Sequence, residues 1–408
     1  MARAKLRKFD LPLFAAMSAL IFLSLLLLYH IHSQGQAGIP QLFQRQLIYA
    51  VVGFCLFWAA AAMSPRVHFA LAYILYTAAC LILLGIFIWG SIAKGAVRWI
   101  DLGLFTFQPS EPAKIALILA LARLVTDKKF DLQKPVHLLR AIGLTGLPMI
   151  LVLIQPDLGT SIIFASLFFF MMLVAGIPSS SLLILVSPLL AAITSFHATT
   201  FLIFMILLVG LAWRTKLYLG WMVFLVLGNL AISAATPYFW NHLKPYQQKR
   251  LVIFIHPEAD PKGSGYQVIQ SKVAVGSGGI LGKGLGKGSQ TQLKFLPEQH
   301  TDFIFAMLAE EMGLAGATAA IILYGVIIAR GFRIAMQCSG RYTSLVCVGL
   351  SSMITVHVFI NIGMALGLMP VTGLPLPFLS YGGSFLWTAM ISVGIILGAQ
   401  LRWGDYTP

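Results

Sequence analysis

The sequence predicts an all-α fold: a polytopic transmembrane helical bundle of about twelve spans with one large extracytoplasmic loop. Of its 408 residues, 59% are hydrophobic and only 10% are charged, whereas a soluble domain carries about 25% charged residues. The mean hydropathy is +0.88. The apolar residues form long runs, many of which approach the roughly 20 residues that a helix needs to cross a bilayer core.

Twelve apolar runs are expected to span the membrane within a single domain, 1–408. They lie at 11–30, 47–64, 69–91, 109–125, 138–155, 159–177, 181–197, 200–213, 217–236, 303–329, 345–369 and 381–401. The run 200–213 is the weakest, because it is short and only HATT separates it from its neighbour. The basic start MARAKLRKFD leads into the first run without a small-residue cleavage pattern, which favours an uncleaved first span.

Charge placement orients these spans. With the N-terminus inside, the cytoplasmic segments receive Arg3, Lys5, Arg7, Lys8, Arg66, Lys128, Lys129, Lys134, Arg214, Lys216, Arg330, Arg333, Arg341 and Arg402. The short outside loops receive only Arg45, Lys94 and Arg98. This asymmetry follows the positive-inside rule and explains much of the net charge of +15. No basic stripe interleaved with aromatics occurs, so nucleic acid is not expected as a partner. The four cysteines have no metal-ligand spacing and are expected to be free thiols.

One connection, 237–301, is far longer than the others and is expected outside. It holds eight basic and three acidic residues, an excess that the positive-inside rule does not explain for a long loop. An anionic partner outside the cell, such as a lipid pyrophosphate, would explain it; attraction to anionic lipid headgroups is the alternative. We expect Lys249 and Arg250, near the start of the loop, to contact a pyrophosphate.

The loop also contains a glycine-rich stretch, GSGGILGKGLGKGS. It lacks the G-x-x-x-x-G-K-[ST] spacing of a phosphate-binding loop, because Ser277 and Leu281 stand where glycine is needed. Its glycines still permit tight turns with exposed backbone N–H groups. A structural cluster of turns and a phosphate contact both remain open for this stretch.

Ionisable residues near the outer face are functional candidates, because charge at membrane depth is costly. Glu111 and Lys114 stand three residues apart and share a helix face, so they can form a structural salt bridge or serve a site. Asp157, in QPDLGTS, is expected to cap the following span. Glu298 and Glu310 are candidates with either a structural or a functional role.

Asp302 stands where a polar loop becomes an apolar helix, in LPEQHTDFIFAML. An N-cap role is open to it, since aspartate is a good cap. His300, Thr301 and Glu298 crowd the same turn, however, and a cluster of titratable groups at such an entrance favours a site. The sequence alone leaves both readings of Asp302 open.

The longest motifs resemble those of the SEDS family, the proteins of shape, elongation, division and sporulation. They are AKGAVRWIDLGLFTFQPSEPAKIA, QPDLGTS, HPEADPKGSGYQVIQSKVAVGSGG, FLPEQHTDFIFAMLAEEMG and PVTGLPLPFLSYGGS. The resemblance extends from the first span to the last, and is stronger to the elongation branch than to the division branch. Family members typically have ten spans; the surplus lies between about 178 and 236.

The resemblance implies a peptidoglycan glycosyltransferase of the bacterial cytoplasmic membrane. Such an enzyme polymerises lipid II into β-1,4-linked glycan at the outer face and releases undecaprenyl pyrophosphate. The resemblance makes Asp302 the essential aspartate and maps the acid and base of the Q-P-S-E-x-x-K motif to Glu111 and Lys114. With His300, Ser380 and Tyr381, the Glu111–Lys114 pair is assigned to substrate binding.

The implied partners are a class B penicillin-binding protein that crosslinks the strands, other membrane proteins of the elongation machinery, and membrane lipids. Inversion at the anomeric carbon needs one general base rather than a pair of nucleophiles. No cofactor is certain, and a divalent cation, Mg²⁺ or Mn²⁺, stays open. A lipid II flippase and a non-catalytic scaffold are the alternative functions.

Overall fold

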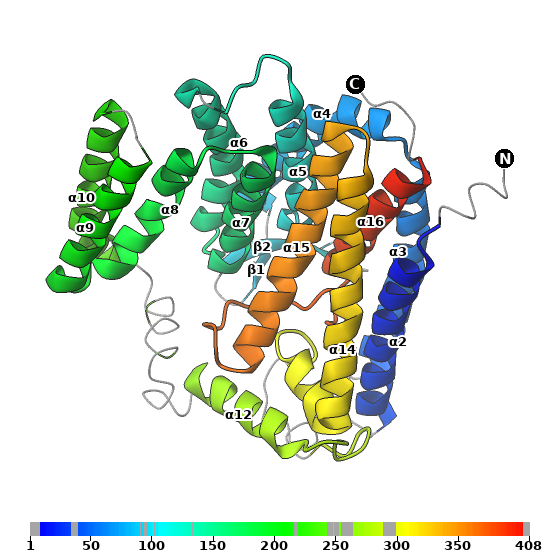
Figure 1. Ribbon diagram of the computed structural model, residues 1–408. Coiled ribbons are helices and arrows are strands. Elements are labelled where there is room, and N and C mark those ends of the chain that lie inside the picture. Colours follow the sequence, from blue (N-terminus) through cyan, green and yellow to red (C-terminus); the bar gives the residue numbers. More distant parts are fainter. Residues whose placement is uncertain are drawn as a thin grey trace.

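The computed structural model describes residues 9–33, 40–89, 91–93, 96–101, 103, 105–132, 134–215, 219–242, 248, 253, 264–288 and 299–402. These residues form a bundle of long helices with a small sheet (Figure 1). The helices are α2 (Leu11–Ser33), α3 (Pro40–Ala62), α4 (Pro65–Trp89), α5 (Ser110–Thr126), α6 (Pro135–Ile154), α7 (Leu158–Ala175), α8 (Ser179–Thr194), α9 (Ala198–Arg214), α10 (Leu219–His242), α12 (Ser264–Ser277), α14 (Ile304–Gln337), α15 (Arg341–Ala365) and α16 (Gly383–Leu401).

Each of the twelve predicted runs is occupied by one helix, and α12 is an additional helix within the large loop. Among the described residues, nine helices are both long and apolar enough to cross a membrane. The other three, α5, α8 and α9, have 16 or 17 residues. The chain is therefore a multi-pass membrane protein, while the count of twelve and the orientation stay predictions.

Three predicted boundaries were wrong by more than five residues. Helix α3 begins at Pro40, seven residues early, because proline is well suited to the first turn of a helix. Helix α10 continues through Pro237 to His242, so the large loop begins later than predicted. Helix α14 extends past 329 because the Arg330 guanidinium is paired with Asp10, at 2.8 Å from Nε and 2.6 Å from Nη2, which stabilises a charged residue inside the helix.

A three-stranded antiparallel sheet lies between α4 and α5 and was not predicted. It consists of β1 (Ser91–Ala93), β2 (Ala96–Asp101) and β3 (Thr106–Phe107). Ile100 pairs with Phe107, and Asp101 pairs with Thr106. Strands this short give little periodicity to read, so the sequence suggested only a loop.

Helix α15 occupies the centre of the bundle, where 83% of its span is buried. Helices α14, α5, α7 and α16 pack around it. The first two helices close the bundle, because α2 packs on α14 and α3 packs on α16. Helices α8, α9 and α10 pack on one another at one side of the bundle (Figure 1), and Asn229 Nδ2 of α10 donates to Ser187 Oγ of α8 at 3.0 Å. The surplus segment of the sequence forms this three-helix unit.

The glycine-rich stretch forms turns that pack against α14, which confirms the structural reading for residues 276–288. The helix is interrupted at Gly313, where φ is 66° and ψ is −164°. The carbonyls of Glu310 and Glu311 accept hydrogen bonds from the turn, from Lys283 N and Gly284 N, both at 3.0 Å. The turn therefore supplies donors that the interrupted helix lacks.

Gly282→Ala is expected to loosen this contact. Gly282 has φ +82°, and a Cβ there would collide with the Glu311 carbonyl group. Gly279→Ala is the matched control, because Gly279 also has a positive φ but faces open space. Both variants carry the left-handed penalty of about 1–2 kcal/mol, and only Gly282→Ala adds the collision. Hydrogen exchange at Leu314 N and Ala315 N should accelerate more in Gly282→Ala; equal acceleration would contradict the packing role.

Candidate functional site

Asp302 lies in the turn that precedes α14, half-buried at the end of the large loop. The N-cap position of the helix belongs to Phe303, whose side chain makes no capping hydrogen bond. Asp302 is thus one residue outside the helix rather than at its cap. The alternative sequence reading, in which Asp302 serves as the N-cap, is therefore wrong.

The turn that carries Asp302 is tied to the connection between α15 and α16, residues 366–382. Residues 300 and 301 offer their carbonyl oxygens to this connection, and Asp302 offers its own to Asn361 of α15. The three bonds are Tyr381 N to His300 O at 2.9 Å, Ser380 Oγ to Thr301 O at 2.6 Å and Asn361 Nδ2 to Asp302 O at 2.9 Å. Three successive bonds fix the backbone of the turn, and hence the direction in which the Asp302 side chain leaves it.

Asn361 links the backbone at Asp302 to the backbone at Leu374. Besides the Asp302 carbonyl, its amide donates to Leu374 O at 2.8 Å, and the residue is fully buried. A Cβ at Gly373 would lie 3.5 Å from Asp302 Oδ2, so the carboxylate faces a backbone segment without a side chain. Glycine at 373 therefore leaves room beside the Asp302 oxygens.

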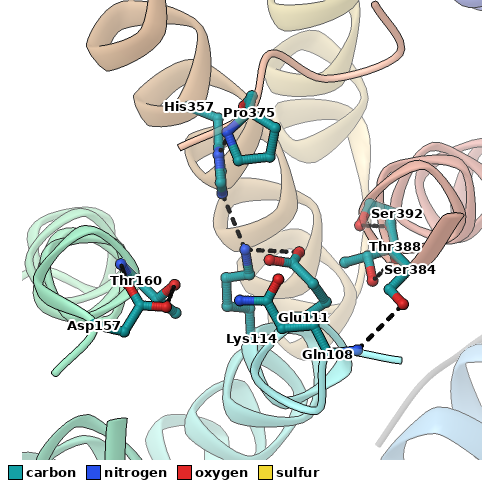
Figure 2. A network of polar contacts seen from close by, with 10 residues as sticks. All are labelled: Gln108, Glu111, Lys114, Asp157, Thr160, His357, Pro375, Ser384, Thr388 and Ser392. Carbon is teal, nitrogen blue, oxygen red and sulfur yellow. Dashed lines mark hydrogen bonds and ion pairs between the residues drawn. The ribbon is translucent and has the colours of Figure 1, made fainter. Parts of the chain in front are cut away.

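Glu111 and Lys114, predicted as a pair, form a buried ion pair near the start of α5 (Figure 2). Lys114 Nζ lies 2.8 Å from Glu111 Oε2, and the two residues are 0% and 2% exposed. The ammonium also contacts His357 Nε2 of α15 at 3.1 Å. The expected salt bridge is confirmed, and His357 extends it to the central helix.

His357 connects this pair to the segment beside Asp302. Its Nδ1 lies 3.3 Å from Pro375 O, while Nε2 faces Lys114 (Figure 2). Pro375 follows Leu374, which Asn361 holds. Through His357 and Asn361 of α15, the buried charges of α5 and the Asp302 turn are therefore linked to the same short stretch of backbone, residues 373–375.

Asp157 caps α7, as predicted. Its Oδ1 accepts from Thr160 N at 3.1 Å and its Oδ2 from Thr160 Oγ1 at 3.0 Å (Figure 2). Arg98 of β2 donates to the carbonyls of Gln155 and Pro156 just before it. The small sheet thus fastens the start of α7 next to the site.

Tyr381 and His300, both assigned to substrate binding, are neighbours with ring centroids 5.8 Å apart. Burial and the nearby Tyr49 raise the pKa of the Tyr381 phenol above its usual value, although Arg45 beside it acts in the opposite direction. The phenol therefore remains protonated at neutral pH, close to the exposed Arg45 guanidinium near the start of α3. A hydrogen-bond donor and a cation lie together here, a combination suited to phosphate oxygens.

The remaining predicted residues have other surroundings. Ser380 is 1% exposed, and its hydroxyl both donates to Thr301 O and accepts from Leu376 N, which favours a role in shaping the loop. Glu310 is fully buried and pairs with Lys283 at 2.8 Å, a structural contact. Lys249, Arg250 and Glu298 lie outside the described residues.

Sequence reasoning missed His357 and Asn361, although a signal was present. The two polar residues stand four apart in an otherwise apolar span, so they share one face of α15. Polar side chains within a span usually face the bundle interior and mark a functional region. Applying that rule to neutral residues as well as to acids would have identified both.

The chain matches the family model FtsW/RodA/SpoVE, described as cell cycle protein, over residues 6–202 and 194–402. It is 39% identical to the peptidoglycan glycosyltransferase MrdB of Escherichia coli strain K12, covering 87% of this chain and 84% of that protein. It is 34% identical to the peptidoglycan glycosyltransferase RodA of Treponema pallidum strain Nichols, covering 97% and 98%.

Solved structures agree with these relatives. A chain of a peptidoglycan synthase complex, described as coordinating polymerization and crosslinking, has a TM-score of 0.71 at 32% identity and covers 98% of this chain and 99% of its own. The rod shape determining protein RodA of Thermus thermophilus has a TM-score of 0.65 at 27% identity, covering 98% of each chain. The sequence motifs, the helical bundle and these matches agree: the chain belongs to the FtsW/RodA/SpoVE family.

Proposed function

We propose that this chain is an inverting peptidoglycan glycosyltransferase that polymerises lipid II at the outer face of the bacterial cytoplasmic membrane. The observation that carries the proposal is the fixed position of Asp302, whose turn is held by three hydrogen bonds. The relatives named peptidoglycan glycosyltransferase support the same activity.

Asp302 acts as the general base in this proposal. The acceptor hydroxyl attacks the anomeric carbon of the donor sugar, the bond from that carbon to the pyrophosphate oxygen breaks, and the hydroxyl proton passes to the carboxylate. A single displacement converts an α-linked donor into a β-linked product. A positioned base contributes about 10²–10⁴-fold to such a step.

The departing pyrophosphate needs positive charge and hydrogen-bond donors. Arg45 and the neutral Tyr381 phenol supply both among the described residues, beside His300. Lys249 and Arg250 remain candidates for the same role from the large loop. The buried Lys114 ammonium is already shared between Glu111 and His357, so we assign this pair to holding the 373–375 backbone in place.

A divalent cation, Mg²⁺ or Mn²⁺, that bridges the carboxylate and the pyrophosphate stays open in this proposal. Within the described ranges, no three side chains of the His, Cys, Asp and Glu types gather to hold a metal ion. The steps above are written for the residues of this chain alone. A class B penicillin-binding protein is the proposed crosslinking partner, in line with the similarity to a peptidoglycan synthase complex.

Purified protein supplied with fluorescent lipid II is expected to produce a ladder of glycan polymers on a gel. Digestion with a muramidase should collapse the ladder, which controls for aggregation of the lipid. A flippase would instead move lipid II across vesicle membranes without forming polymer, and a scaffold would do neither. Absence of polymer both alone and with the crosslinking partner present would overturn the proposal.

A further inference from the structure

The turn at 278–284 presents two large apolar side chains to the surroundings. Ile280 is 72% exposed and Leu281 is 82% exposed, the latter being the most exposed large apolar side chain among the described residues. Both belong to the large loop. Exposing their side chains to water costs about 25 cal/mol of free energy per Å² of apolar surface. Such a pair at the tip of an ordered turn requires a covering partner.

The hydrogen bonds of the turn place it along the axis of α14. Leu314 N donates to Gly279 O at 2.9 Å, and Ala315 N donates to Ile280 O at 3.0 Å. Ile280 therefore sits level with the first residues after the interruption at Gly313. Its depth relative to the membrane is the depth of Leu314.

The part of α14 that follows the interruption at Gly313 is long enough to cross a bilayer, and its charges locate the boundary. A span of about 20 residues counted back from the cytoplasmic Arg330 or Arg333 ends between Glu311 and Leu314. Between that point and Arg330, the helix surface includes exposed apolar side chains, with Leu314 at 63% and Ile322 at 59%. The turn thus meets the helix where the outer edge of the hydrocarbon region is expected.

We propose that Ile280 and Leu281 insert into the outer leaflet of the membrane and anchor the turn at that depth. The exposed apolar surface of α14 continues into the tip, so one lipid environment covers both. Lys287, exposed six residues after Leu281, reaches the level of the lipid phosphates, as basic residues next to inserted apolar groups do.

The anchor has a consequence for Asp302. The turn is bonded to the carbonyls of Glu310 and Glu311, and the buried first turns of α14 connect these residues to Asp302. Fixing the turn in the leaflet fixes the depth of the carboxylate relative to the membrane. This last step rests on the proposed function, because that depth matters for a substrate whose reacting sugar is tethered to a membrane lipid.

The test uses the full-length protein in vesicles of phosphatidylethanolamine and phosphatidylglycerol. Leu281→Cys is labelled with an environment-sensitive fluorophore after the exposed Cys55 and the half-buried Cys338 are replaced by serine. Lys287→Cys, just after the end of the turn, is the matched control. Nitroxide groups on the upper acyl chain should quench the probe at 281 several-fold more than the probe at 287, and aqueous iodide should show the reverse order.

Equal iodide quenching at both positions would overturn the anchor, because the tip would then face water. Shielding that appears only after a penicillin-binding protein is added would overturn it in favour of a protein-docking surface. The fluorescence does not depend on catalysis. Lipid quenching at 281 in a protein that makes no glycan would leave the anchor standing while the proposed function failed.

Discussion

Asp302→Asn is expected to reduce glycan polymerisation by about 10²–10⁴-fold, because an amide cannot accept the proton of the attacking hydroxyl. The substitution keeps the size of the side chain. The three bonds that hold the turn use backbone carbonyls of residues 300–302, so they survive it. The loss should therefore be confined to the chemical step and be read from initial rates of purified protein on labelled lipid II.

The matched control is Asp101→Asn, at the exposed end of β2, where Oδ1 accepts a local bond from Gly103 N at 2.9 Å. That variant should polymerise at nearly the parental rate. The Asp302→Asn protein should melt close to the parent and keep its crosslinking partner. Normal polymerisation by a folded Asp302→Asn protein would refute the assignment of the base, and the base would then have to be sought elsewhere.

Lys114→Met should destabilise the bundle more than any surface substitution. Lys114 is fully buried, and removing it leaves the Glu111 carboxylate, 2% exposed, without its 2.8 Å partner. Breaking a buried ion pair from one side costs about 3–5 kcal/mol. The temperature of thermal unfolding in detergent and the resistance to proteolysis should both fall. Polymerisation should fall with them, because the 373–375 backbone is no longer held in place.

A double variant separates charge from packing. Glu111→Gln combined with Lys114→Met removes both charges and should recover most of the lost stability, since the penalty comes from an unpaired buried charge. Lys128→Met, at an exposed position after α5, is the control and should change nothing measurable. If the double variant were as unstable as Lys114→Met alone, lost packing rather than lost pairing would be the cause.

The helices could be predicted from the sequence because bilayer thickness fixes the length of an apolar run. Every predicted run holds one helix, including 200–213, which is α9. The ends were less predictable. Whether α14 stops near 329 or continues through Arg330 depends on Asp10, which is 320 residues away in the chain, and no local pattern reports that contact.

In the site too, contacts between residues close in the sequence could be predicted, and contacts between distant segments could not. Contacts within one helix or one turn, such as Glu111 with Lys114 and Asp157 with Thr160, follow from spacing alone and were predicted. The hold of Asn361 on the Asp302 and Leu374 carbonyls could not be derived, because backbone acceptors leave no trace in the side-chain pattern. The chemical roles of the residues stay predictions until the variants are measured.

The closure of the bundle by its two ends has a consequence for biogenesis. Helices α2 and α3 leave the ribosome first, but their packing partners α14 and α16 are made last. Trp387 Nε1 of α16 donates to Tyr49 O of α3 at 2.9 Å, and Ser24 Oγ of α2 donates to Leu379 O, in the connection before α16, at 2.6 Å. Until α16 is inserted, the surfaces of α2 and α3 that later pack against α14 and α16 remain exposed to lipid. Such non-local pairing is slow to form and exposes the intermediate to misassembly, so a chain truncated before α16 should be degraded rather than accumulate as a partly working protein.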